Sequence, residues 1–356
     1  MAANAYVMKR PLLITHPDCE KHEKPGHPER PERLAAVMKR VHASGLSQDM
    51  DVKLATEISD QLLMQVHPKS HIEHVVNSEP DNSWLHIDPD TYMSAGSVRA
   101  AKLAVGACVE ATTRVLDGQY QHAFCAIRPP GHHAELMDAM GFCLFNNAAV
   151  AAMVALEDPS VDRIAILDFD VHHCNGTVDI FKEDERVLVC SSFQDHFYPH
   201  RYLDFSNNHI VTTPLAPGTS SLQYRRAIEA SWLKKIEQHQ PDFIFVSAGF
   251  DAHAEDPLAE LRLMDDDYTW ITELIVGLAD QYAQGRVVNF HIIYLLWFKK
   301  LVCVLMSDLP ICTGYDTLAP QKTNHWNAAW QQRFPLSTNM TLNTANWSKL
   351  RRGYAG

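Results

Sequence analysis

The segment between Ile164 and His173 places three polar side chains at alternating positions directly after an apolar run. The run predicts a buried strand, and Asp168, Asp170 and His172 follow at its end. Side chains alternate between the two faces of a strand, so these three point to the same side. Two carboxylates and an imidazole among apolar neighbours are costly to bury unless a cation offsets their charge. The spacing therefore favours a metal site, and the alternative is a polar strand end that caps the next helix.

Short apolar runs alternate with helical patterns along most of the chain. Strands are expected at residues 123–127, 163–170, 186–192, 242–250 and 286–288. Helices are expected at residues 94–116, 146–156, 222–238 and 265–283. This alternation predicts βαβ units and a parallel sheet, in which ligands bind beyond the carboxyl ends of the strands. Polar clusters do follow three of the expected strands, at residues 128–133, 168–172 and 251–256.

Composition narrows the classes of function. The chain has 356 residues and a formal net charge of -12, which argues against a nucleic-acid-binding protein that works by bulk electrostatics. Its length suits one large α/β domain or two ordinary ones. The eight cysteines form no Cys-x-x-Cys pair, so we expect reduced thiols in the cytoplasm and no cysteine-ligated zinc. The segment from Met1 to Arg10 has no long apolar stretch, so no secretory signal is expected.

A catalytic zinc site uses three protein ligands and leaves one position open for water or substrate. Asp170 and His172 can supply two of the ligands. Asp256, just past the end of another expected strand, is the predicted third ligand. Two Asp and one His form an oxygen-rich set that suits Zn²⁺ and would also accept Fe²⁺ or Co²⁺. The alternative for Asp256 is an N-cap before a helix.

The adjacent histidines His132 and His133 lie in a glycine-containing loop after an expected strand. Such a pair can take a proton from a water molecule and pass it to a leaving group, although tandem histidines on a loop can also be merely solvated. Each imidazole needs an orienting partner on its other nitrogen, and Asp168 and Asn175 are available. A neutral Asn leaves its histidine less basic than an Asp does, so the two histidines should differ in pKa.

Taken together, these motifs resemble the histone deacetylase superfamily, in particular the class II-like branch that includes bacterial acetylpolyamine amidohydrolases. The matching segments are His16–Cys19, Gly26–Leu34, Arg128–His133, Gly141–Asn147, Asp168–Thr177 and Ser247–His253. They occur in the family's order and span residues 14 to 288. The resemblance implies the α/β arginase/deacetylase fold, a single mostly parallel sheet of about eight strands with helices on both faces.

The resemblance also implies roles for the residues of the site. The implied zinc ligands are Asp170, His172 and Asp256. The implied general base, which also acts as general acid, is His133, with His132 as an electrostatic partner oriented by Asp168. The implied ligands of a structural potassium ion are Asp168, the Ser191 hydroxyl and the backbone carbonyls of Asp170 and His172. Asn175, where class I members carry Asp, matches the class II pattern.

Gly141 and Phe142 follow the histidine pair after a short loop. From the residues alone, Phe142 is expected either to wall a narrow apolar channel or to pack like any other core phenylalanine. The resemblance implies that Phe142 lines a tunnel for acyl-lysine, together with an aromatic side chain from the Phe197-Tyr198-Pro199 loop, for which Tyr198 is the candidate.

The implied activity is zinc-dependent hydrolysis that removes acetyl (acyl) groups from lysine side chains or polyamines. The expected partner is an acetylated lysine peptide, a protein or an acetylpolyamine, with no direct nucleic-acid binding and no membrane. One alternative is a catalytically weak or inactive paralogue that binds zinc and acyl-lysine. An arginase-like dinuclear manganese enzyme is not favoured, because it would need more carboxylates and has no use for the histidine pair. The oligomeric state is left open.

The chain departs from the family pattern in two places. Cys174 stands where the family usually has Gly, and a left-handed backbone there would disfavour it. After Val288 the match stops, and the Glu-Gly-Gly-Tyr loop, whose Tyr hydrogen-bonds the substrate carbonyl in the family, is absent. Tyr315, in Thr313-Gly-Tyr315, is the one candidate replacement.

The last stretch of the chain differs in character from the rest. It starts with an apolar run interrupted by Lys299 and Lys300, so a membrane span is not expected. Beyond that run it is basic and rich in Asn, Thr and Trp. A buried helix, an interfacial helix and sequence translated out of frame are the interpretations, and a frameshift near residue 288 is preferred. We therefore expect a deacetylase domain at residues 1–288 and a divergent tail at residues 289–356.

Overall fold

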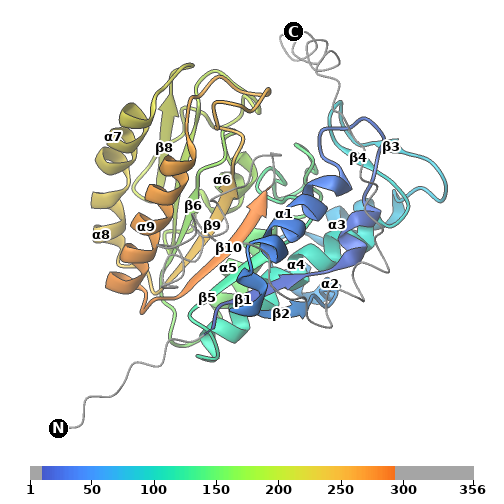
Figure 1. The fold of residues 1–356 in the computed structure, drawn as a ribbon. Coiled ribbons are helices and arrows are strands. Elements are labelled where there is room, and N and C mark those ends of the chain that lie inside the picture. Colours follow the sequence, from blue (N-terminus) through green and yellow to red (C-terminus); the bar gives the residue numbers. More distant parts are fainter. Residues whose placement is uncertain (1–9, 293–356) are drawn as a thin grey trace. The chain divides into compact units, whose positions relative to one another are not determined.

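The computed structural model describes residues 10–292. Within them, eight strands form one sheet in the order β2-β1-β5-β10-β9-β6-β7-β8. Every neighbouring pair in this sheet is parallel (Figure 1). In sheet order the strands are β2 (Asp51–Leu54), β1 (Leu12–Thr15), β5 (His122–Ala126), β10 (Val287–Ile292), β9 (Phe243–Gly249), β6 (Ile164–Asp168), β7 (Val187–Gln194) and β8 (Ile210–Leu215). The predicted parallel α/β sheet is confirmed.

The helices cover both faces of the sheet. They are α1 (Pro31–Ala43), α2 (Asp60–Leu63), α3 (Lys69–Asn77), α4 (Ser97–Leu116), α5 (Asn147–Ala155), α6 (Asn175–Phe181), α7 (Ser221–Ser231), α8 (Leu233–His239) and α9 (Asp265–Tyr282), with short 3-10 helices at Pro17–Lys21 and Leu46–Gln48. Parallel strands are joined by right-handed crossovers. A connection to a strand nearer β8 therefore lies on one face of the sheet, and a connection to a strand nearer β2 lies on the other face. Helices α4, α5 and α6 thus share one face, and α1, α7, α8 and α9 share the other.

A small antiparallel pair, β3 (Leu85–His86) and β4 (Tyr92–Met93), stands outside the main sheet. Among the described helices, none combines the length and the apolar character needed to cross a membrane.

Two expected elements differ from the structure. The helix expected at residues 222–238 is divided into α7 and α8 at Trp232, which is buried and donates a 3.2 Å hydrogen bond from Nε1 to Thr213 Oγ1 of β8. The last strand does not end at Val288, because β10 continues to Ile292. Asn289 and Phe290 are both buried there, so the sequence past Val288 still suits a central strand.

Strand β10 lies in the middle of the sheet, between β5 and β9. The ring of Phe290 stacks on Phe245 of β9 with centroids 5.5 Å apart. The strand therefore helps to hold together the two halves of the sheet that flank it. Residues 293–356, including Tyr315, lie outside the described residues.

We predict that Phe290→Ala destabilises the protein by about 3–5 kcal/mol, because it leaves a cavity in the centre of the core. The measurement is the free energy of unfolding from urea titration. The matched control is Leu222→Ala, since Leu222 is 59% exposed whereas Phe290 is 3% exposed, and it should change stability by less than about 0.5 kcal/mol. Equal effects of the two substitutions would show that the strand past Val288 adds nothing to the sheet.

Candidate metal and catalytic site

The carboxyl ends of β6 and β9 bring the acidic residues of the site together. The two strands pair in parallel with Asp168 opposite Ser247, so the segments that follow them leave the sheet at the same edge. Gly249 permits their close approach, because a Cβ at this position would lie 2.0 Å from Asp170 Oδ2. A glycine is therefore needed where β9 passes the Asp170 carboxylate.

Three side chains at this edge form the one cluster with metal-ligand geometry among residues 10–292: Asp170, His172 and Asp251. Their ligand atoms all lie within 4.8 Å of one another. His172 Nδ1 is 2.9 Å from Asp170 Oδ1 and 2.9 Å from Asp251 Oδ2. Both carboxylates are 1% exposed.

The electrostatics of this cluster call for a positive charge. Burial opposes protonation of His172, yet attraction to Asp251 and hydrogen bonds to both carboxylates raise its pKa to about 10. An imidazolium proton thus sits where two buried carboxylates meet. His172 Nδ1 faces one oxygen of each buried carboxylate, so a single proton serves both acids. A cation at this point would balance the charge of both carboxylates, so the donor set fits a metal ion.

The structure places Asp251 beside Asp170 and His172 as a further candidate ligand, and Asp256, the predicted third ligand, stays a prediction. Asp256 Oδ1 accepts a 2.8 Å hydrogen bond from the backbone N–H of Leu258, and the next described helix begins only at Asp265. Burial and the neighbouring charge of Asp251 raise the pKa of Asp256 to about 8, and His172 acts on it in the opposite direction. The Asp256 carboxyl therefore lies close enough to the cluster to respond to its charges.

The two histidines after β5 have the orienting partners that the sequence suggested. His132 Nδ1 lies 3.0 Å from Asp168 Oδ2, and His133 Nδ1 lies 2.7 Å from Asn175 Oδ1. Burial opposes protonation of His132, but attraction to Asp168 and Asp170 raises its pKa. Burial and repulsion from His132 and His172 hold the pKa of His133 well below its usual range. The expected difference in pKa between the pair is therefore present.

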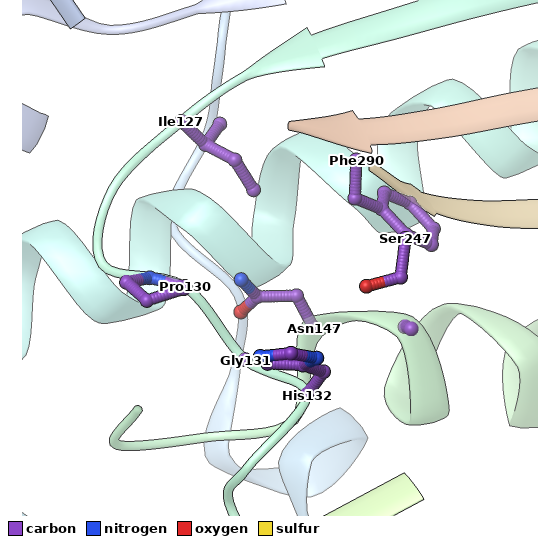
Figure 2. Close-up of a pocket in the computed structure, with 8 residues that line it drawn as sticks. Ile127, Pro130, Gly131, His132, Asn147, Ser247 and Phe290 are labelled. Atoms are coloured by element: carbon purple, nitrogen blue, oxygen red, sulfur yellow. The ribbon is translucent and has the colours of Figure 1, made fainter. Parts of the chain in front are cut away.

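The loop that carries the histidines is anchored by Arg128 at its start. The Arg128 guanidinium is buried and donates from Nε to Glu29 Oε1 at 2.7 Å. It also donates to the backbone carbonyls of Cys19 and His22, at 2.8 and 2.7 Å. These bonds tie the loop to the N-terminal segment. The pocket lined by Pro130, Gly131, His132, Asn147, Ser247 and Phe290 lies beside this loop (Figure 2).

Gly141 and two aromatic residues surround His133 and His172. Gly141 has φ +56°, and a Cβ there would lie 2.4 Å from His133 Cδ2, so only glycine fits. Tyr198 lies edge-on to His133, with centroids 5.2 Å apart. Phe197, from the same loop, stacks on His172 at 5.1 Å.

Phe142, the other predicted wall residue, has an unusual backbone. Its φ is +68°, a left-handed conformation that is strained for a bulky side chain. Its N–H donates to Thr91 Oγ1 at 3.1 Å, and its ring contacts the edge of His27 at 5.0 Å. These contacts hold the strained residue in place next to Gly141.

The residues predicted for potassium lie on neighbouring strands. Asp168 of β6 pairs with Ser191 of β7, and Ser191 Oγ lies 2.9 Å from His173 Nδ1. The departure at Cys174 is accommodated, because its φ of -78° is in the range that any residue adopts. The close approach falls at Gly176 instead, where a Cβ would lie 2.3 Å from Ala134 O.

Two residues of the site were missed from the sequence. Asp251 was grouped with the right loop but not chosen, although it directly follows the strand. Glu135 was not singled out at all; its Oε1 accepts a 2.6 Å hydrogen bond from Asn175 Nδ2. The signal for Glu135 was its place two residues after His133 in the same loop.

Comparison with known proteins finds relatives over most of the chain. The histone deacetylase domain family matches residues 27–291. The chain is 35% identical over 273 residues to a histone deacetylase-like amidohydrolase of Pseudomonas aeruginosa, covering 75% of this chain and 72% of that protein. It is 34% identical over 285 residues to a probable deacetylase of Archaeoglobus fulgidus, covering 78% and 79% of the two chains. The crystal structure of the HDA15 HD domain superposes with a TM-score of 0.79 at 30% identity, over 88% of this chain and 92% of that one. The chain therefore belongs to the histone deacetylase domain family.

Proposed function

We propose that this protein is a zinc-dependent amidohydrolase that removes acetyl (acyl) groups from lysine side chains or polyamines. The observation that carries the proposal is the buried cluster of Asp170, His172 and Asp251 beside two histidines with opposite pKa shifts. A metal that activates water needs a base and a charged partner close by, and the histidine pair offers both. The family membership supports a hydrolase of this class.

Asp170 and His172 would hold the zinc ion, with either Asp256, the predicted ligand, or Asp251 of the cluster as the third ligand. When bound, zinc supplies a Lewis acid that polarises the substrate carbonyl and acidifies a water molecule. His133 is neutral near pH 7, because its pKa is lowered. Its Nδ1 faces Asn175 Oδ1, so that nitrogen carries the proton and Nε2 is left to accept one. His133 would take a proton from the attacking water and deliver it to the leaving amine.

His132 has a different role in this proposal. Attraction to Asp168 favours its charged form, against burial. A positive imidazolium stabilises the negative charge that develops on the substrate oxygen. The methylene chain of the acyl-lysine or polyamine would pack against aromatic rings, for which Phe142 and Tyr198 are the candidates. A potassium ion near Asp168 and Ser191 would serve a structural purpose.

One feature of the sequence favours a second candidate function. The Glu-Gly-Gly-Tyr loop is absent, and loss of one oxyanion donor costs about 10²–10³ in rate. A weak enzyme or an inactive acyl-lysine-binding paralogue would result unless another group, such as Tyr315, supplies the donor. Polarisation by zinc alone would still permit slow turnover.

The experiment that tests the function is a deacetylation assay with the zinc-reconstituted protein. The substrates are an acetyl-lysine peptide, a trifluoroacetyl-lysine peptide and a monoacetylated polyamine. We expect turnover that is lost on chelation, and that His133→Ala lowers by about 10²–10⁴ through loss of the base. Turnover that survives chelation or His133→Ala would sink the proposed mechanism.

The activated substrate separates the two candidates. The trifluoroacetyl carbonyl needs less help from a hydrogen-bond donor than the acetyl carbonyl. Cleavage of both substrates supports an enzyme with a working carbonyl donor. Cleavage of the trifluoroacetyl peptide alone indicates an enzyme that lacks this donor, and cleavage of neither, with zinc and a hydroxamate still bound, supports the binding protein.

We also predict that Asp251→Asn weakens zinc binding by at least about 10–100-fold, the range that follows from loss of outer-shell partners alone. Asp256→Asn is the matched comparison, since Asp256 is also a buried carboxylate but accepts a hydrogen bond from the backbone of Leu258. The measurement is zinc per chain after dialysis, by elemental analysis. Loss of zinc in Asp256→Asn with zinc retained in Asp251→Asn would contradict this expectation and confirm Asp256, the ligand predicted from the sequence.

A further inference from the structure

A chain of polar contacts runs from His133 toward the surface. His133 Nδ1 contacts Asn175 Oδ1 at 2.7 Å, and Asn175 Nδ2 donates to Glu135 Oε1 at 2.6 Å. Glu135 Oε2 accepts from Arg201 Nη1 at 2.5 Å. Asn175 is fully buried and Glu135 is 6% exposed, while Arg201 is half exposed. The segments that meet here are the loop after β5, the start of α6 and the loop after β7.

Arg201, at the surface end of this series of contacts, fixes which group donates and which accepts at each step. The oxygen and nitrogen ends of an Asn amide have nearly the same shape, so its partners decide which way it points. A carboxylate is an acceptor only, and a guanidinium is a donor only. Since Arg201 donates to one oxygen of Glu135, the other oxygen is free to accept from Asn175. The nitrogen of the amide must then face Glu135, and its oxygen must face His133.

The orientation of the amide in turn fixes the tautomer of His133. An oxygen facing Nδ1 requires that Nδ1 carry the proton, which leaves Nε2 bare. Asn175 Nδ2 also donates in two longer contacts, at 3.4 Å to His133 O and 3.3 Å to Met140 Sδ, which support the same orientation of the amide. The bond to Glu135 is the shortest of the three and the only one to a charged acceptor.

The same contact bears on the identity of residue 175. An Asp at this position would place a second carboxylate within hydrogen-bond distance of Glu135. Two carboxylates so close cannot both be ionised, so one would take up a proton. With Glu135 present, an amide at position 175 is the group that can accept from His133 and donate outward at once.

We propose that Glu135 is a positioning residue, which holds the Asn175 amide in the orientation that keeps His133 in its Nδ1-protonated tautomer. This inference rests on the proposed function, in which His133 Nε2 accepts the proton. Glu135 does not touch the metal cluster, so its effect passes through Asn175. Arg201 supports it from the surface.

The test exchanges the carboxyl and amide groups between the two positions. Glu135→Gln can turn its own NH₂ toward Asn175, which allows the Asn175 amide to flip and to present Nδ2 to His133. We expect a fall in kcat of about tenfold, within the range for partial loss of a general base, with KM unchanged. Asn175→Asp should also lower kcat, because its carboxyl must share a proton with Glu135.

The double substitution Glu135→Gln/Asn175→Asp restores the order, with the Gln amide donating to Asp and Asp accepting from His133. We expect its kcat to exceed that of either single variant. The direct readout is the ring ¹⁵N NMR shifts of His133 in the zinc-loaded protein. They should report the Nδ1-protonated tautomer in the parent and the double variant, and a mixture of tautomers in Glu135→Gln.

The matched control is Asp138→Asn. Asp138 is an exposed carboxylate 3.6 Å from Arg201, and its side chain makes no bond to Asn175 in the described part of the chain. This substitution should leave kcat and the His133 shifts unchanged. If Glu135→Gln fails to fold, Arg201→Gln removes the supporting donor from the surface, and it should lower kcat by about twofold to threefold with the same change in tautomer.

Unchanged His133 shifts in Glu135→Gln, or a double variant whose loss is the product of the single losses, would overturn the inference. Failure of the proposed function is a separate result, because it would appear as a parent protein without turnover. In that case the NMR comparison still decides whether Glu135 sets the tautomer.

Discussion

The site depends on one constraint: two carboxylates, Asp170 and Asp251, are buried side by side. Solvent does not reach them, so it does not screen their negative charge. Their negative charge draws a proton onto His172 and raises its pKa to about 10. Without a cation this arrangement is costly, and the free energy of burial must come from the packed sheet around it. The strand pairing of β6 with β9 enforces the contact.

Two neighbouring imidazoles, those of His132 and His133, have pKa values shifted in opposite directions. His132 gains a carboxylate partner in Asp168, and His133 gains a neutral one in Asn175. The rings are only 3.9 Å apart, so the charge on one suppresses protonation of the other. A single pair of residues can therefore supply a cation and a base at the same pH. The buried anchor at Arg128 and the glycine at position 141 keep the loop in the one geometry that allows this.

The sequence predicted the sheet well where strands are apolar throughout, and poorly where they are short or partly polar. Strands β1 and β2 have four residues each, too few for a periodic pattern, and both were missed. Strand β8 was missed as well, because its apolar run is interrupted by Thr212, Thr213 and Pro214. The site was predictable wherever a motif places side chains on one strand end, as for Asp170 and His172. The sequence does not decide between Asp251 and Asp256, because both follow β9 and both lie close to the cluster. Glu135 was hidden for a similar reason, since its partner Asn175 lies 40 residues further along the chain.

The sequence departs from the family pattern after Val288, which lies in β10, a central strand between β5 and β9. Strand β10 runs parallel to β9, with Ile292 opposite Gly249, and Gly249 touches the Asp170 carboxylate. The described residues therefore end at the carboxyl end of β10, where its arrow ends in Figure 1, next to the carboxyl end of β9. In parallel sheets, the segments that follow strands at this edge build the ligand site. The departure of the sequence after Val288 therefore falls on the strand whose carboxyl end lies next to the cluster, while Asn289 and Phe290 keep that strand buried in the sheet.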